Sequence, residues 1–266
     1  MPLIPNPQSL IPNGALVPNP KSLIPACANA LAAALFAPAC AVCSALLDEP
    51  LSGCVCAPCW RSIRPITPPI CDRCGDPLPR PDSSTPHCSG GRSAVTRARA
   101  VGEYEGALRD IIHALKYAGR LSLAGPLAAH MRTRGIDVLT DVDCLVPVPL
   151  HWRREHQRGF NQAREIARHL GPPVIGALVR RRPTRPQIEL AADRRKTNVA
   201  DAFAVRRAWF RGYDIRGKTV LLVDDVSTTG ATLEACAAVL RDAGAADVHA
   251  LTAARVVARR RYPSMP

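Results

Sequence analysis

The sequence predicts an α/β protein with a parallel sheet, preceded by a small cysteine-rich module that binds metal. Short apolar runs alternate with helical patterns from about Ala98 onward, and nine of the eleven cysteines lie between Cys27 and Cys88. Strands that alternate with helices over this length imply parallel pairing through right-handed crossovers. A chain of 266 residues has room for a full domain core and for a smaller module beside it.

The formal net charge of +13 points to polyanionic partners, either phosphorylated metabolites or nucleic acid. The charge is concentrated, because the stretch from Leu145 to Arg216 holds sixteen Lys and Arg against six Asp and Glu. An arginine-rich solvated surface is the alternative explanation. The aromatic content of 4% argues against recognition by base stacking, but it leaves phosphate contacts open.

Residues 1–30 repeat one proline-rich phrase, PNPQSLIP and then PNPKSLIP. Proline at that density removes the hydrogen bonds of helices and central strands, so we expect a disordered extension. The apolar run from Leu23 to Cys43 is similar to a signal peptide. Pro25 and Asn29 interrupt its apolar character, however, and the cysteines that follow have the spacing of metal ligands. We therefore expect a cytoplasmic protein. No clean apolar stretch reaches eighteen residues, so we expect no membrane insertion.

Residues 31–93 are expected to form a double zinc ribbon. Cys40-x-x-Cys43 and Cys56-x-x-Cys59 are separated by twelve residues, which is the spacing of a four-thiolate zinc site. Each turn directs two sulfurs at one ion, and the zinc replaces the hydrophobic core that so short a module lacks. Disulfides are the alternative, and they are disfavoured in a cytoplasmic chain.

The second half of the ribbon is degenerate. After Cys71-x-x-Cys74 a second CxxC motif is expected, but only its first cysteine, Cys88, is present. Gly91 occupies the position of the fourth thiolate. His87 offers a nitrogen ligand, although ligands at adjacent positions are awkward. The sequence therefore predicts either a weak metal site or a relic without metal.

The α/β region can be followed element by element. Leu108, Ile111, Ile112 and Leu115 form a helical face, and LSLAGPLAAHM begins a second helix. Cys144 to Leu150 is expected to be a strand and Phe160 to Leu170 a helix. TVLLVD forms the central strand, a helix runs from Leu233 towards Gly244, and Asp247 to Ala254 form the next strand.

The segment VLLVDDVSTTGATLEAC, Val220 to Cys236, carries the candidate site. The four apolar residues are typical of a buried parallel strand, so the polar stretch after them is expected to be a strand-to-helix loop, where ligands of open sheets bind. The small residues let backbone N–H groups approach a phosphate with the helix N-terminus behind them. Asp224 and Asp225 can accept hydrogen bonds from ribose hydroxyls. A Walker loop is excluded because no Gly-Lys-Ser/Thr follows.

The alternative is that the two acids only end the strand and a threonine caps the helix. The whole string, however, resembles the phosphoribosyl pyrophosphate (PRPP) signature of type I phosphoribosyltransferases. The resemblance implies that Asp224 and Asp225 hold the ribose 2′ and 3′ hydroxyls. It also implies that the loop holds the 5′-phosphate through Ser227, Thr228, Thr229, Gly230, Ala231 and Thr232.

Motifs along the rest of the chain resemble the ComF family of competence-associated, phosphoribosyltransferase-like proteins. They are the cysteine ribbon, YEGALRDIIHALKYAGR, VPVPLHWRREHQRGFNQA, RPTRPQIELAADRRKTNVADAF and the PRPP loop, in that order. The resemblance implies a type I phosphoribosyltransferase fold over residues 98–262 and a cytoplasmic setting. In some members it implies a part in handling incoming single-stranded DNA during transformation.

The same resemblance implies further site residues. Pro149 and His151 match the pyrophosphate loop, and the stretch with Arg182, Gln187, Arg195 and Asn198 matches the mobile loop that closes over PRPP. Arg182 and Arg195 then stabilise the departing pyrophosphate, and the pyrophosphate carries Mg²⁺. Two hypotheses follow: an enzyme that transfers phosphoribose to a nitrogenous acceptor, with Asp224, Asp225, Arg182 and Arg195 as its catalytic set, or a competence protein that binds single-stranded DNA and works with DNA-uptake proteins.

Overall fold

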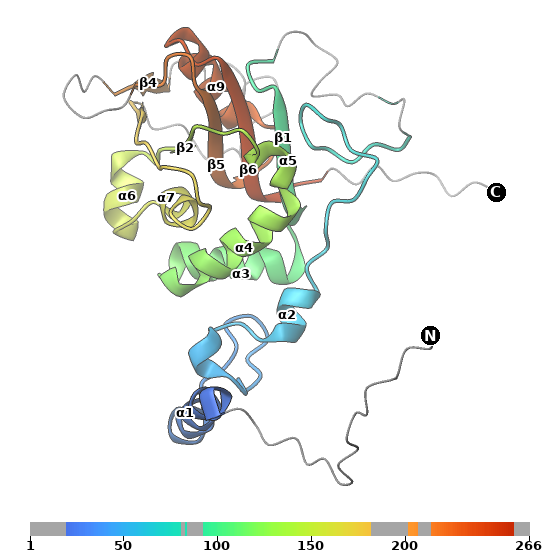
Figure 1. Ribbon diagram of the computed structural model, residues 1–266, viewed down its shortest axis with the longest axis vertical. Helices are drawn as coiled ribbons and strands as arrows, with labels where there is room; N and C mark the ends of the chain where they lie inside the picture. The colour runs from blue at the N-terminus through green and yellow to red at the C-terminus, as the bar shows by residue number, and fades with distance from the viewer. Residues whose placement is uncertain (1–19, 81–82, 84–92, 182–201, 207–213, 258–266) are drawn as a thin grey trace, which may run out of the picture.

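The computed structural model describes residues 20–80, 83, 93–181, 202–206 and 214–257 (Figure 1). A four-stranded sheet has the order β1-β6-β5-β2, and all three of its pairings are parallel. Its strands are β1 (Arg97–Glu103), β2 (Cys144–Pro147), β5 (Thr219–Ser227) and β6 (Asp247–Arg255). The parallel sheet predicted from the alternating pattern is confirmed.

Helices cover both faces of the sheet. One face packs against α3 (Gly106–Tyr117), α4 (Ala124–Arg134) and α7 (Gln162–Ala167), and the other packs against α9 (Ala231–Asp242) and the antiparallel pair β3 (Leu178–Arg180) and β4 (Phe203–Val205). The short helices η2 (Leu121–Leu123), α5 (Ile136–Leu139) and α6 (Trp152–Arg158) connect these elements.

The central strand β5 lies between two cores. Leu221 and Val223 belong to the core under α3 and α4, whereas Val220 and Leu222 belong to the core under α9. All four side chains are fully buried. A strand covered on both faces needs apolar residues at every position, which is why this run shows no alternation.

The cysteine-rich module forms the end of the molecule opposite the sheet (Figure 1) and contains α1 (Pro20–Phe36), η1 (Pro50–Ser52) and α2 (Ala57–Arg61). Helix α1 begins ten residues before the boundary at residue 30 that we expected for the proline-rich extension. Buried Asn29 then accepts a hydrogen bond of 2.9 Å from the Leu51 N–H, which fixes the helix against η1.

The module continues along β1, the edge strand of the sheet. Pro65 and Gly102 form an antiparallel bridge, and the Glu103 N–H donates to the Arg64 carbonyl at 3.0 Å. Before this bridge in the chain, the Trp60 ring of α2 stacks on His130 of α4, with 4.9 Å between the ring centroids. This strand edge is therefore covered rather than left open for pairing with another chain. Within the described residues, no helix is both long and apolar enough to cross a membrane.

We predict that Gly102→Ala loosens the attachment of the module to β1. A Cβ there would overlap the Arg64 carbonyl oxygen, so the free energy of unfolding should fall by about 1–3 kcal/mol. Gly176→Ala is the control, because a Cβ at that position meets no atom within 4 Å. Urea unfolding of both variants gives the comparison, and equal midpoints would contradict the packing described here.

Candidate functional site

The two acids lie in a strand and not in a loop. Strand β5 runs to Ser227 because β6 pairs with it beyond the end of β2, with Asp224 opposite Thr252 and Ser227 opposite Arg255. Helix α9 begins at Ala231. The expected loop therefore shortens to residues 228–230, and Ala231 and Thr232 belong to the first turn of α9.

The acids follow the alternation of the strand, which sends neighbouring side chains to opposite faces. Asp225 is 4% exposed and its Oδ2 forms an ion pair with Lys116 Nζ, which projects from the last turn of α3. Its other oxygen accepts the Val226 N–H at 2.8 Å, and Asp224 Oδ1 accepts the Asp225 N–H at 2.8 Å. Each carboxylate thus has part of its hydrogen-bonding capacity satisfied inside the fold.

Burial shifts the pKa values of two groups at this site, Asp224 and Lys116. It raises the pKa of Asp224 to about 7, against the opposing pull of Lys116 and Arg180. It also lowers the pKa of Lys116 to about 8, against the charge of Asp224 and together with the repulsion from Arg158 and Arg154. Both groups thus titrate close to neutral pH, which is typical of functional sites.

Three arginines lie close enough to influence the charges of Asp224 and Lys116. Arg154 and Arg158 come from α6 and Arg180 ends β3. Arg158 stacks over the Tyr117 ring at 5.0 Å and donates to Gln162 Oε1 at 3.1 Å, and Arg180 lies over the Phe203 ring at 5.3 Å. These contacts hold the guanidinium groups near the carboxyl ends of β2 and β5.

Pro149 and His151 follow β2 at the same edge of the sheet. The Val148 N–H donates to the Val223 carbonyl at 2.9 Å, which brings the segment beside the acids. His151 is 6% exposed, and its Nδ1 accepts the Arg153 N–H at 3.4 Å as the cap of α6. Burial and the neighbouring Arg180, Arg153 and Arg154 lower its pKa, so the ring is neutral at pH 7.

The shortened loop keeps the features that suit a phosphate. Gly230 adopts a left-handed conformation, with φ of 77°, directly before the twelve-residue helix α9. Thr229 Oγ1 accepts the Ala231 N–H at 3.4 Å. Ser227 differs from its neighbours, because it is 4% exposed and its Oγ accepts a hydrogen bond of 3.2 Å from Arg255. The structure thus brings together the acids, Thr228 to Thr232, Pro149 and His151, whereas Ser227 is engaged inside the fold.

Several predicted residues lie outside the described residues. They are Arg182, Gln187, Arg195 and Asn198 of the expected mobile loop, and His87 and Cys88 of the second ribbon.

Sequence reasoning missed the residues that position the site. Lys116 lies in the motif YEGALRDIIHALKYAGR, but nothing in the sequence shows that it reaches Asp225. Asn161 is 2% exposed, accepts the N–H groups of Ala163 and Arg164, and donates to the Val148 carbonyl at 3.0 Å. An asparagine directly before a helical pattern is an N-cap signal and could have found it.

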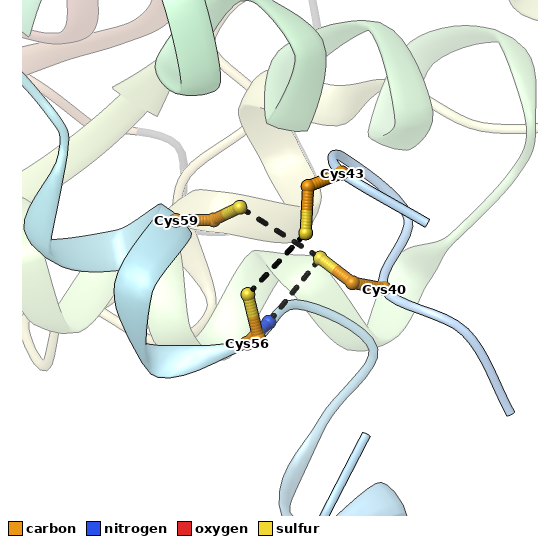
Figure 2. Close-up of side chains that lie close together, drawn as sticks. All are labelled: Cys40, Cys43, Cys56 and Cys59. Atoms are coloured by element: carbon orange, nitrogen blue, oxygen red, sulfur yellow. Dashed lines mark hydrogen bonds between the residues drawn. The ribbon is translucent and has the colours of Figure 1, made fainter. Parts of the chain in front are cut away.

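The first cysteine set forms the metal site that its spacing predicts (Figure 2). The sulfurs of Cys40, Cys43, Cys56 and Cys59 lie within 4.8 Å of one another, with 3.9 Å between Cys40 and Cys59 and 3.7 Å between Cys43 and Cys56. Tetrahedral zinc with Zn–S bonds of about 2.3 Å separates its sulfurs by roughly 3.8 Å. The four thiols therefore fit a structural zinc.

Backbone N–H groups donate hydrogen bonds to one of these ligands, Cys40. The N–H groups of Val42 and Cys56 point at Cys40 Sγ from 3.4 and 3.3 Å. Burial raises the pKa of Cys40, but the backbone hydrogen bonds outweigh it and lower the pKa to about 6. These hydrogen bonds favour the thiolate, which is the form that binds metal.

Each CxxC turn is closed by a backbone hydrogen bond and is called a knuckle here: the first runs from Cys40 to Ala45 and the second from Cys71 to Asp76. The second knuckle repeats the backbone of the first. The Cys40 N–H donates to the Ala45 carbonyl at 2.7 Å, and the Cys71 N–H donates to the Asp76 carbonyl at 2.8 Å. The bridge between Ala39 and Leu46 likewise has its counterpart between Ile70 and Pro77. The degenerate half of the ribbon thus keeps the turn that presents two thiols.

We predict that Cys59→Ser loses the zinc of the first ribbon. Loss of a structural metal removes more than about 4 kcal/mol of stability, which lowers the melting temperature by more than about 10 °C. Cys27→Ser is the matched control, because Cys27 is exposed and outside the cluster. Elemental analysis with thermal unfolding tests this, and an equal zinc content in both variants would contradict the site.

We also predict that Asp224 makes stability fall as the pH rises. With the pKa of Asp224 raised to about 7, the folded protein keeps a proton that the unfolded chain releases near pH 4. Between these values the free energy of unfolding therefore decreases, by up to about 1.4 kcal/mol per pH unit. Chemical unfolding from pH 4.5 to 7.5 should show a shallower decline in Asp224→Asn than in the control Asp242→Asn, which changes an exposed acid. Parallel curves would refute the shift.

Two family models match the chain. The double zinc ribbon domain matches residues 31–89, and the phosphoribosyl transferase domain matches residues 156–266. The chain therefore carries a phosphoribosyltransferase fold behind a zinc-ribbon module.

Relatives match across both parts. DNA utilization protein YhgH of Salmonella typhimurium is 31% identical over 207 residues, which cover 73% of this chain and 87% of that protein. Competence protein F of Haemophilus influenzae is 27% identical over 76% of this chain and 90% of its own length. Competence protein ComFC of Bacillus subtilis is 29% identical over 76% and 84%. With the ribbon, the transferase domain and these relatives in agreement, the chain belongs to the ComF family.

Proposed function

We propose that the protein binds PRPP with Mg²⁺ and transfers its phosphoribosyl group to a nitrogenous acceptor in the cytoplasm. The observation that carries this proposal is the pair of adjacent carboxylates, half-buried Asp224 and buried Asp225, next to a glycine-containing loop and a helix N-terminus. Lys116 compensates the charge of Asp225. Acids alone would repel a phosphate. Acids beside an anion cradle suit a ligand that offers hydroxyls and a phosphate together.

Each group has a chemical task in this proposal. The carboxylates accept hydrogen bonds from the ribose hydroxyls, and the N–H groups of residues 228–232 hold the 5′-phosphate. Arg154, Arg158 and Arg180 stabilise the negative charge of the departing pyrophosphate. Mg²⁺, carried by the pyrophosphate, supplies further charge neutralisation. Displacement at the anomeric carbon then joins the ribose to the acceptor nitrogen.

The ion pair of Lys116 with Asp225 adds a requirement. The ribose hydroxyls must share or displace Lys116 Nζ, since it already occupies one carboxylate oxygen. The lowered pKa of Lys116 means that its ammonium gives up a proton more readily than that of an exposed lysine, and loss of this proton would free the carboxylate oxygen.

Calorimetric titration with PRPP and Mg²⁺ tests the proposal. Wild type should bind, and the double variant Asp224→Asn, Asp225→Asn should lose at least about tenfold in affinity, because an amide is a weaker acceptor than a carboxylate. Asp242→Asn, on the exposed side of α9, should bind as wild type does. Absence of binding by wild type would remove the enzyme hypothesis.

A second candidate function is binding of single-stranded DNA at the mouth of the same site. Tyr117 and Trp152 are 68% and 63% exposed, and each carries an arginine, Arg158 at 5.0 Å and Arg153 at 5.3 Å from the ring centre. Although the overall aromatic content is low, these exposed rings lie where bases could stack beside phosphate-binding cations. Relatives named for DNA utilization and competence agree with this candidate.

Salt dependence and one ring distinguish this function from a small-molecule pocket. Binding of a fluorescent oligonucleotide should weaken steeply as salt rises, since phosphate contacts release counterions. Trp152→Ala should cost about 1–3 kcal/mol if bases stack on the ring. Phe36→Ala, which removes an exposed ring on the remote helix α1, should have no effect. Equal losses in the two variants would argue against a DNA surface at α6.

A further inference from the structure

A buried arginine connects the second cysteine knuckle with the candidate phosphate loop. Arg255 ends β6 and is 2% exposed. In the register of the sheet it lies between Glu103 of β1 and Ser227 of β5. Its guanidinium Nε pairs with Asp76 Oδ1, and its Nη1 donates to Ser227 Oγ at 3.2 Å.

Asp76 is fixed on its other side by the knuckle. Its carbonyl accepts the Cys71 N–H at 2.8 Å, and the Gly75 N–H donates to the Cys71 carbonyl at 2.8 Å. The backbone is close to the sheet here, because a Cβ on Gly75 would lie 2.7 Å from the Ala98 carbonyl oxygen. The Asp76 carboxylate can therefore hold Arg255 only while the knuckle keeps this shape.

Ser227 is the last residue of β5 and directly precedes the loop at residues 228–230. Its hydroxyl accepts from Arg255, and its carbonyl accepts the Val256 N–H at 2.9 Å. Arg255 at the end of β6 and Val256 directly after it thus determine where the loop begins. Because Ser227 is only 4% exposed, its hydroxyl is not available to a ligand. It influences the site through the position of the loop that follows.

Removing one partner from such a linkage leaves a charge in an apolar environment. The Arg255 and Asp76 side chains are 3% and 15% exposed, and a buried charge that loses its partner must find another or draw in water. Among the described residues the Arg255 Nη2 atom is already buried without a hydrogen bond, so loss of Asp76 would leave only the Ser227 contact of this guanidinium.

We propose that Arg255 is a positioning residue for the phosphate loop, and that Asp76 makes this position depend on the Cys71–Asp76 knuckle. The second half of the ribbon then regulates the ribose-phosphate site through Asp76, Arg255 and Ser227. This inference rests on the proposed function for its effect on PRPP. The mechanical linkage itself needs no ligand.

Asp76→Asn tests the linkage, with Asp72→Asn as matched control. Asp72 lies in the same knuckle, but its side chain is 90% exposed and pairs with Arg99. Without ligand, amide hydrogen exchange of a peptide covering residues 228–232 should be faster in Asp76→Asn and unchanged in Asp72→Asn. Arg255→Lys, which keeps the buried charge but cannot bridge both partners, should also accelerate it. Unchanged exchange in both variants would overturn the linkage.

Affinity for PRPP tests the consequence. Asp76→Asn should weaken PRPP binding about tenfold, within the range of ordinary coupling free energies, whereas a purely structural loss of stability would leave the affinity of the folded protein intact. In a Ser227→Ala background the same change should have little further effect, because the linkage is already broken. Faster exchange with unchanged affinity, or fully additive effects, would overturn the regulatory role. If wild type binds no PRPP, the proposed function fails, and the exchange experiment still decides the linkage.

Discussion

The candidate site depends on two neighbouring carboxylates at the carboxyl end of β5, of which Asp225 is buried and Asp224 half-buried. A strand presents consecutive side chains to opposite faces, so Asp224 and Asp225 require compensation from different elements. Lys116 reaches Asp225 from α3, and Arg180 ends the β3 strand on the side of Asp224. Because a buried charge without a partner is costly, the ion pair of Lys116 with Asp225 constrains where α3 ends.

The ribbon module holds a metal site and also packs against the sheet domain. Its four-sulfur cluster replaces a hydrophobic core, while Leu47, Val55 and Cys59 join the core that continues under α3 and α4. The chain after α2 then covers the free edge of β1. A zinc-dependent module is thus built into the surface that also supports α3, and α3 carries Lys116.

The features that could be predicted from the sequence are those determined by a short local pattern. Four consecutive apolar residues identified β5, and two CxxC turns at ribbon spacing identified the sulfur cluster. Long-range pairing controlled the rest. Strand β5 continues through the acids because β6 is equally long, and α1 passes Pro25 where proline density predicted disorder. Contacts such as Lys116 with Asp225 and Arg255 with Asp76 join residues more than one hundred positions apart, and no local pattern in one sequence reports them.

The most direct test of the account is a nuclear magnetic resonance titration with ribose 5-phosphate, which offers the hydroxyls and the phosphate without the pyrophosphate. The account predicts that the amide signals of residues 224–232 shift first and saturate together, because the acids and the loop bind one molecule. A contradictory result would be no shift in this segment. Shifts confined to the cavity of about 590 Å³ between the second knuckle and β1, lined by Pro68, Arg99 and Asp137 among others, would also contradict it.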